Sequence, residues 1–204
     1  MLLIAWTGKT GWGPMEKNEI EAKVFLSRAK IARLKEKILK AGGKRNGISE
    51  EKNFILDHPG GTLKKKGDLL RVRIFRNGKG LVTFKKTIKG GRKSRFKAKK
   101  EKEVEVGDGE GVLRTFESMG LVKKWRYDKR RESFRLGKIN IEIDTLPVLG
   151  TFVEVEARSE KELEKALKEL GLDKEEISKE TYHEVLHRRL GLGKKAVRDL
   201  VWGK

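Results

Sequence analysis

The sequence predicts an α+β fold, a closed eight-stranded antiparallel β-barrel with a charged interior and helices packed outside. Several candidate strands alternate apolar with charged residues, as in Glu19-Ile20-Glu21-Ala22-Lys23 and Glu154-Val155-Glu156, and successive side chains on a strand point to opposite faces. Amphipathic helical segments lie between the strands and would cover the apolar face. Because closure of about eight strands leaves room for side chains or one small ligand, we expect the charged faces to line the inside.

The first half of the chain supplies five expected strands, one helix and a tight turn. Ser27 can cap the helix, whose apolar positions are three and four residues apart, and Gly42-Gly43 ends it. The dipeptide Asn77-Gly78 between two alternating segments is typical of a hairpin. The expected strands cover residues 18–25, 53–56, 69–75, 81–86 and about 100–106.

The second half continues the same mixture of elements. A helix is expected through Val112, Phe116 and Met119, and two capping boxes, Ser159 to Glu162 and Thr181 to Glu184, begin further helices. The basic tail is expected to form a short helix. The expected strands cover residues 122–134, 139–144 and 151–157, which brings the total to eight.

Length and composition fit one domain with extensions. The 204 residues are 36% hydrophobic and 39% charged, with the clustered apolar residues of a folded chain. The lack of cysteine excludes disulfides and thiolate zinc sites, and only three histidines argue against a histidine-rich metal centre. We expect a tunnel domain over residues 15–190 and a basic C-terminal tail over 191–204. Residues 1–14 are either an N-terminal arm or an over-extended start.

The net charge of +20 is unevenly distributed. From Lys64 to Lys102 there are 17 lysines and arginines against 2 acidic residues. Such a density can hold nucleic acid through counterion release, or a compact polyphosphate, and a solvated basic surface is the plain alternative. No stretch is long enough to span a membrane, so we expect a cytoplasmic protein.

The charged strand faces carry the expected chemistry. Glu19 and Glu21 share one face of the first strand, and Glu154 and Glu156 share one face of the last. Carboxylates suit Mg²⁺ or Mn²⁺, whereas lysine and arginine suit phosphate oxygens. One acidic pair alone is typical of a solvated edge, but two pairs backed by apolar faces indicate a metal and polyphosphate site. The basic side chains expected to reach the same interior are Lys23, Arg71, Arg73, Lys85, Lys124 and Arg126.

At these residues the chain resembles the CYTH superfamily, also called triphosphate tunnel metalloenzymes, which includes class IV adenylyl cyclases and thiamine triphosphatases. Five of its motifs occur in order, and a similar C-terminal segment follows, over about residues 18–190. The segments that carry the resemblance are Glu19 to Lys23, Leu70 to Arg73, Thr83 to Lys85, Lys124 with Arg126, Asp144 with Phe152 to Glu156, and Thr181 to Leu186.

The resemblance implies a divalent-metal-dependent enzyme that acts on nucleotide or organic triphosphates. The reaction would be either cyclisation of ATP to cyclic AMP and pyrophosphate, or hydrolysis of a triphosphate, and a homodimer stays open. It implies a catalytic role for Glu19, Glu21 and Asp144, and phosphate binding by the six basic residues. The implied metal ligands are Glu19, Glu21, Glu103, Glu154 and Glu156, where Glu103 stands for a middle acidic pair that fits either Glu101/Glu103 or Glu103/Glu105.

A different class of function also fits the basic residues. The basic link at residues 87–100 and the basic tail could serve a non-catalytic protein that binds RNA or polyphosphate. Its affinity would fall steeply with salt and survive chelation. A tunnel enzyme, by contrast, would need Mg²⁺ or Mn²⁺.

Overall fold

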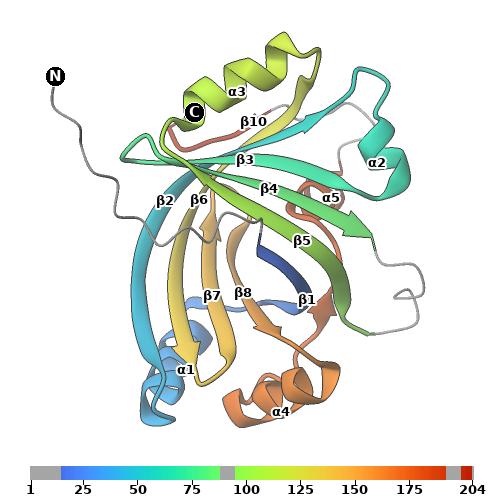
Figure 1. Cartoon of the computed structure of the whole chain (residues 1–204). Coiled ribbons are helices and arrows are strands. Elements are labelled where there is room, and N and C mark those ends of the chain that lie inside the picture. Colours follow the sequence, from blue (N-terminus) through green and yellow to red (C-terminus); the bar gives the residue numbers. More distant parts are fainter. Residues whose placement is uncertain (1–14, 88–94, 192–198, 204) are drawn as a thin grey trace, which may run out of the picture.

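The computed structural model describes residues 15–87, 95–191 and 199–203, with side chains described from Ile20 onward. The arm at 1–14 and large parts of the basic link and tail therefore lie outside the described residues. Eight antiparallel strands form a closed ring in the order β6-β2-β3-β4-β5-β1-β8-β7, and β7 pairs with β6 again (Figure 1). This ring confirms the predicted fold class. Its strands are β1 (Met15–Phe25), β2 (Lys44–Asp57), β3 (Leu69–Phe75), β4 (Gly80–Thr87), β5 (Lys97–Val106), β6 (Val122–Leu136), β7 (Ile139–Leu146) and β8 (Gly150–Ala157).

Five helices and two short strands complete the described chain. Helices α1 and α4 lie together at one end of the ring and α3 lies at the other (Figure 1). Strand β9 pairs with β1, and β10 pairs in parallel with β6. Within these residues, no helix is long and apolar enough to cross a membrane. The elements are α1 (Arg28–Lys40), α2 (Thr62–Lys66), α3 (Gly109–Ser118), α4 (Glu160–Leu170), α5 (Tyr182–Leu190), β9 (Ile177–Ser178) and β10 (Asp199–Leu200).

One expected strand is much longer in the structure, and one expected helix is not tested by it. The strand expected at 53–56 is the 14-residue β2, whose first half is polar and mostly exposed. It is a strand because it pairs along the long β6, from Lys44 opposite Arg135 to Asp57 opposite Val122, and cross-strand hydrogen bonds need no apolar alternation. The short helix expected in the tail falls mostly on residues 192–198, which lie outside the described residues, and the described end of the tail forms β10. Leu200 is buried there beside aromatic side chains of β6.

The main apolar core lies outside the ring, under helices α1 and α4. Ile31, Leu34 and Ile38 of α1 pack with Leu163 and Leu167 of α4 against the outward side chains of β1, β7 and β8. A smaller cluster under α3 joins its Leu113 to the outward side chains of β2 and β3. Because these apolar side chains occupy alternate positions, the charged residues between them point into the ring. The outward side chains of the larger core include Ala22, Val24, Ile141, Ile143, Val153 and Val155.

One end of the ring is apolar on its inner side. Trp125 and Tyr127 of β6 and Phe152 of β8 occupy the same strand faces as the inward charged residues, yet they pack against Val185 and Leu186 of α5. Thr181 and Glu184 form the predicted capping box that begins this helix. Helix α5 therefore fills one end of the ring and leaves the charged faces in the middle.

Candidate functional site

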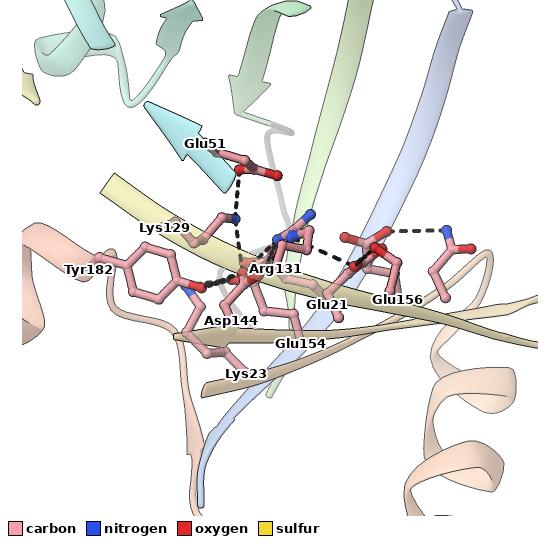
Figure 2. A network of polar contacts seen from close by, with 12 residues as sticks. Glu21, Lys23, Glu51, Lys129, Arg131, Asp144, Glu154, Glu156 and Tyr182 are labelled. Atoms are coloured by element: carbon pink, nitrogen blue, oxygen red, sulfur yellow. Dashed lines mark hydrogen bonds and ion pairs between the residues drawn. The ribbon is translucent and has the colours of Figure 1, made fainter. Parts of the chain in front are cut away.

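Asp144 of β7 is the centre of a buried polar network inside the ring (Figure 2). Its Oδ2 atom accepts hydrogen bonds from Lys129 Nζ at 2.9 Å, from Arg131 at 2.6 Å and from the Tyr182 hydroxyl at 2.9 Å. Its Oδ1 atom accepts from Arg131 Nε at 2.7 Å. Asp144 has no exposed surface, so its carboxylate is fully used in holding these three side chains.

Glu154 of β8 is the second acceptor in the network. It pairs with Lys23 at 3.1 Å and with Arg131 at 2.8 Å. Burial would raise the pKa of Glu154, but the charges of Lys23 and Arg131 outweigh it and hold that pKa well below its usual range. Burial likewise disfavours the charged form of Lys23, but Glu154 and Glu21 raise the pKa of its ammonium group. Both groups are therefore charged at neutral pH.

Tyr182 joins the network to helix α5. Its hydroxyl lies 2.9 Å from Asp144 and 2.9 Å from Glu154, and with one proton it can donate to only one of them at a time. Burial and these two carboxylates raise the pKa of Tyr182 well above its usual value. The Lys23 ammonium lies 4.2 Å from the centre of the tyrosine ring. Tyr182 is therefore a neutral donor at the boundary between the apolar end and the charged middle.

The opposite wall carries two buried arginines on β3. Arg73 lies 3.1 Å from Glu51 of β2, and Glu51 lies 3.6 Å from Lys129, which joins this wall to the Asp144 network. Arg71 donates to Thr83 at 3.3 Å. Its buried Nε atom has no hydrogen-bond partner among the described residues. Arg71 is thus a predicted phosphate-binding residue with a buried donor left for a ligand inside the ring.

The acidic wall is formed by β1 and β8. Glu21 lies directly opposite Glu156 in the strand register. Glu21 pairs with Lys97 at 3.0 Å, and Glu156 accepts from Asn140 at 3.3 Å. The backbone of Glu19 pairs opposite Lys99, but its side chain lies outside the described part of the chain. Among the described side chains, no three carboxylates or histidines form a group that could hold a metal ion.

Strand β5 brings further charged residues to the interior. Lys97, Lys99 and Lys85 of β4 line a small hollow together with Glu21. Burial and the two neighbouring ammonium groups lower the pKa of Lys99. The residues at 97, 99, 101 and 103 share one strand face. The same alternation that pointed to the acids could therefore have predicted that Lys97 and Lys99 face the interior.

Two of the three acids on β5, Glu101 and Glu103, contact β4 through their side chains. Glu101, left open in the sequence analysis, is buried and pairs with Lys85 at 3.3 Å. Glu103 accepts from the Thr83 hydroxyl at 3.0 Å. The carboxylates of the middle acidic segment therefore lie on a strand that β1 separates from the strand of Glu156, next to the predicted phosphate-binding Lys85.

The prediction that Lys124 and Arg126 reach the interior is wrong. Lys124 is exposed and donates to the Pro59 carbonyl at 2.8 Å. Arg126 bonds Asp128 at 3.3 Å and lies beside the ring of Phe54, in the outer cluster under α3. Strand β6 holds a second Lys-x-Arg pair five residues later, and an odd spacing places it on the opposite face. The inward pair is Lys129 and Arg131.

Three residues that organise the interior were missed by the sequence analysis. Lys129 and Arg131 could have been found as an alternative Lys-x-Arg pair, but their face also contains the aromatic Trp125 and Tyr127. No signal in the sequence indicated Glu51, because the polar start of β2 has no alternation. The expected site otherwise comes together, with Glu21, Lys23, Arg71, Arg73, Lys85, Glu103, Asp144, Glu154 and Glu156 all lining one interior.

Comparison with known proteins places this geometry in a family. No curated protein matches the chain. Among solved structures, the chain is similar to the PH1012 protein from Pyrococcus horikoshii OT3, with 28% identity and a TM-score of 0.68 over 82% of this chain and 98% of that one. It also shares the fold of a candidate adenylate cyclase from Vibrio parahaemolyticus, with 20% identity and a TM-score of 0.65 over 83% of this chain and 98% of that one.

A plant protein has the same fold. It is HpAC1 from Hippeastrum, described as a candidate adenylyl cyclase with a dominant triphosphatase activity. The two chains are 19% identical with a TM-score of 0.63, over 89% of this chain and 98% of that one. The model of the CYTH domain matches residues 17–184, which include the whole ring except the first two residues of β1, and the capping box of α5. The chain therefore belongs to the CYTH domain family.

Proposed function

We propose that this protein is a divalent-metal-dependent enzyme that acts on a nucleotide or organic triphosphate. The charged interior of the ring carries the proposal. Well-packed apolar residues in place of buried ion pairs are often neutral or stabilising for folding, so stability alone does not account for such an interior. Perturbed pKa values also gather at functional sites. Membership of a family that is typically enzymatic and in general metal-dependent supports the same conclusion.

The basic side chains are proposed to bind the phosphate oxygens. Arginine offers two parallel donors to phosphate and lysine adds a point charge. Arg71 has a free buried donor, and Arg131 and Lys129 are fixed by Asp144. We therefore assign Asp144 to orienting this pair. The proposed phosphate-binding set is Lys23, Arg71, Arg73, Lys85, Lys129 and Arg131.

The acidic wall fits a bound Mg²⁺ or Mn²⁺. Mg²⁺ takes one or two carboxylates and completes its shell with water and phosphate oxygens, and Glu21 and Glu156 are cross-strand neighbours. We propose these two as ligands, together with Glu19 on the same face of β1. Glu154 and Glu103 remain proposed ligands at the edges of this group. The metal would supply charge neutralisation at the phosphates.

Hydrolysis of a triphosphate is the reaction that the interior favours. Water would attack the terminal phosphorus, and the bond to the bridging oxygen of the next phosphate would break. Cyclisation would require a site for adenine. The inward aromatic rings Trp125, Tyr127 and Phe152 are covered by α5, and the rest of the described inner wall is mainly polar and charged. The Hippeastrum relative, described by its dominant triphosphatase activity, supports the same choice.

Product analysis tests the proposal. The full-length protein is incubated with tripolyphosphate, thiamine triphosphate or ATP, each with Mg²⁺, with Mn²⁺ or with a chelator. We expect orthophosphate release that chelation abolishes. Cyclic AMP and pyrophosphate from ATP would establish the cyclase reaction instead. No turnover of any substrate, with RNA binding that survives chelation and falls steeply with salt, would establish the non-catalytic alternative.

A matched pair of variants tests the inward face of β6. Arg131→Lys keeps the charge but loses the paired donors, and we expect kcat/KM to fall by about 10-fold or more, equivalent to about 1.4 kcal/mol. Arg126→Lys makes the same change on the outer face, and we expect kcat/KM within about twofold of the parent protein. Circular dichroism checks that both variants fold. Equal losses in the two variants would contradict the assignment.

A further inference from the structure

A hollow of about 160 Å³ lies on the outer side of the ring, between α1 and strands β6, β7 and β8. Arg130 and Thr145 line it, whereas their chain neighbours Arg131 and Asp144 bond to each other inside the ring. The hollow and the charged interior therefore occupy opposite faces of the same strands.

Its floor is a row of residues that crosses three strands. Arg130 lies opposite Thr145, and Thr145 lies opposite Thr151 in the register. The two threonine hydroxyls are 3.2 Å apart. The backbone N–H of Leu26 donates to the Thr151 carbonyl at 3.4 Å, which brings the first turn of α1 beside this row. Short threonine side chains under the helix leave the space open.

Helix α1 supplies the other wall. Residues 28, 31 and 35 share one face of the helix because they are three and seven positions apart. Ile31 is buried in the core with Ile143, and both line the hollow. Arg28 stands at the first position of the helix and Lys35 two turns later. The hollow therefore has an apolar side and a cationic rim.

The rim carries two uncompensated charges. Glu132, the carboxylate that lines the hollow, is bound by Lys35 and Arg45. In the part of the chain that the structure describes, Arg28 and Arg130 make no side-chain ion pair or hydrogen bond. Arg28 and Arg130 are both exposed and place two like charges on the rim of the same small space, where a bound oxyanion would balance them. Guanidinium and hydroxyl donors match the oxygens of phosphate.

The geometry points to a second binding site, for a phosphate group, formed by Arg28, Arg130 and the hydroxyls of Thr145 and Thr151. Its volume is below the 300–1,000 Å³ or so of pockets for drug-sized ligands, so the ligand is a small ion or the phosphate end of a monoester. The site does not depend on the proposed enzymatic activity, because it lies outside the ring.

NMR spectra of the arginine Nε–Hε groups in the full-length protein test the site residue by residue. The protein is titrated with inorganic phosphate and, separately, with phenyl phosphate, at constant ionic strength set with sodium chloride. We expect the Arg28 and Arg130 resonances to follow one saturating curve, while that of Arg33, exposed on another face of α1, stays in place. Phosphate ligands inside the ring would move the resonances of Arg71 and Arg73 instead, so the two sites report separately.

Matched substitutions decide the outcome. Arg130→Gln and Arg28→Gln should each weaken phosphate binding at the outer site by about 10-fold or more, whereas Arg33→Gln should leave it unchanged. Saturation by phosphate alone identifies the free ion, and saturation by both ligands identifies a monoester site. The proposal is overturned if chloride moves the two resonances as far as phosphate does, or if the Arg33→Gln protein loses as much affinity as the other two.

Discussion

The inward faces of β6 and β8 differ along their length. Near α5 they carry Trp125 and Phe152, which pack in an apolar cluster, and farther along they carry Lys129 and Glu154, which belong to a buried ion network. Strand alternation is the same in both regions. The alternation of side chains along a strand therefore tells which face of the sheet a residue occupies. It does not tell how far along the inside of the ring that residue lies. Helix α5 determines which stretch is apolar and which is open to a ligand.

Removing the centre of the charged region should have the largest effect on stability. Asp144→Ala leaves Lys129 and Arg131 buried without their shared carboxylate, which we expect to cost about 3–5 kcal/mol of unfolding free energy. Urea denaturation measures the loss. As the control, Glu117→Ala breaks an exposed ion pair with Lys123 and should cost about 0–1 kcal/mol. Similar losses in both variants would contradict the central role of Asp144.

The apolar end should lose stability without losing phosphate affinity. Leu186 of α5 has no exposed surface, and Leu186→Ala should cost about 2–5 kcal/mol through the cavity that it leaves. Calorimetric affinity for tripolyphosphate should stay within about twofold, because no charge of the interior changes. A parallel loss of affinity would show that the two regions act as one unit.

Tyr182→Phe tests the boundary between the two regions. The substitution keeps the ring that packs in the apolar cluster and removes the hydroxyl shared by Asp144 and Glu154. We expect a loss of about 1–3 kcal/mol in urea unfolding, the cost of leaving a buried acceptor short of a donor. A variant as stable as the parent protein would mean that Lys23, Lys129 and Arg131 already satisfy these carboxylates.

The charged middle and the apolar end should differ in how their variants change the dependence of unfolding free energy on pH. Burial opposes ionisation of Glu51, but Lys129 and Arg73 hold its folded-state pKa well below the usual value. A carboxyl with a lowered folded-state pKa stabilises the protein above its unfolded pKa of about 4.3, and this contribution disappears as pH falls through the folded-state pKa. Glu51→Gln should therefore flatten the decline of stability below about pH 4.

A substitution in the apolar end of the ring provides the comparison for this pH experiment. Leu186→Ala changes no titrating group, so its curve of unfolding free energy against pH should lie below that of the parent with the same slope. Urea unfolding between pH 2.5 and 7 measures both variants. An unchanged acid slope in Glu51→Gln would remove Glu51 from the groups that set the acid stability.

The sequence was informative wherever short-range signals decide the structure. The Ser27 and Thr181 caps, the Asn77-Gly78 turn and the alternation of β1, β3 and β8 predicted elements that the structure contains. Alternation also predicted that Glu21, Arg71 and Glu154 face inward. These features depend on residues a few positions apart, whose contacts are fixed by local helix and strand geometry.

Long-range contacts decided the rest. Two Lys-x-Arg pairs on β6 have the same local pattern, and only the packing of Trp125 and Tyr127 against α5 selects Lys129 and Arg131 as the inward pair. The polar first half of β2 forms a strand because β6 pairs along it. The partners of Asp144 come from β6 and α5, which lie 13 to 38 residues away in the chain. Such pairings form only when the ring closes and brings distant strands together. Local sequence patterns do not specify which distant residues then meet.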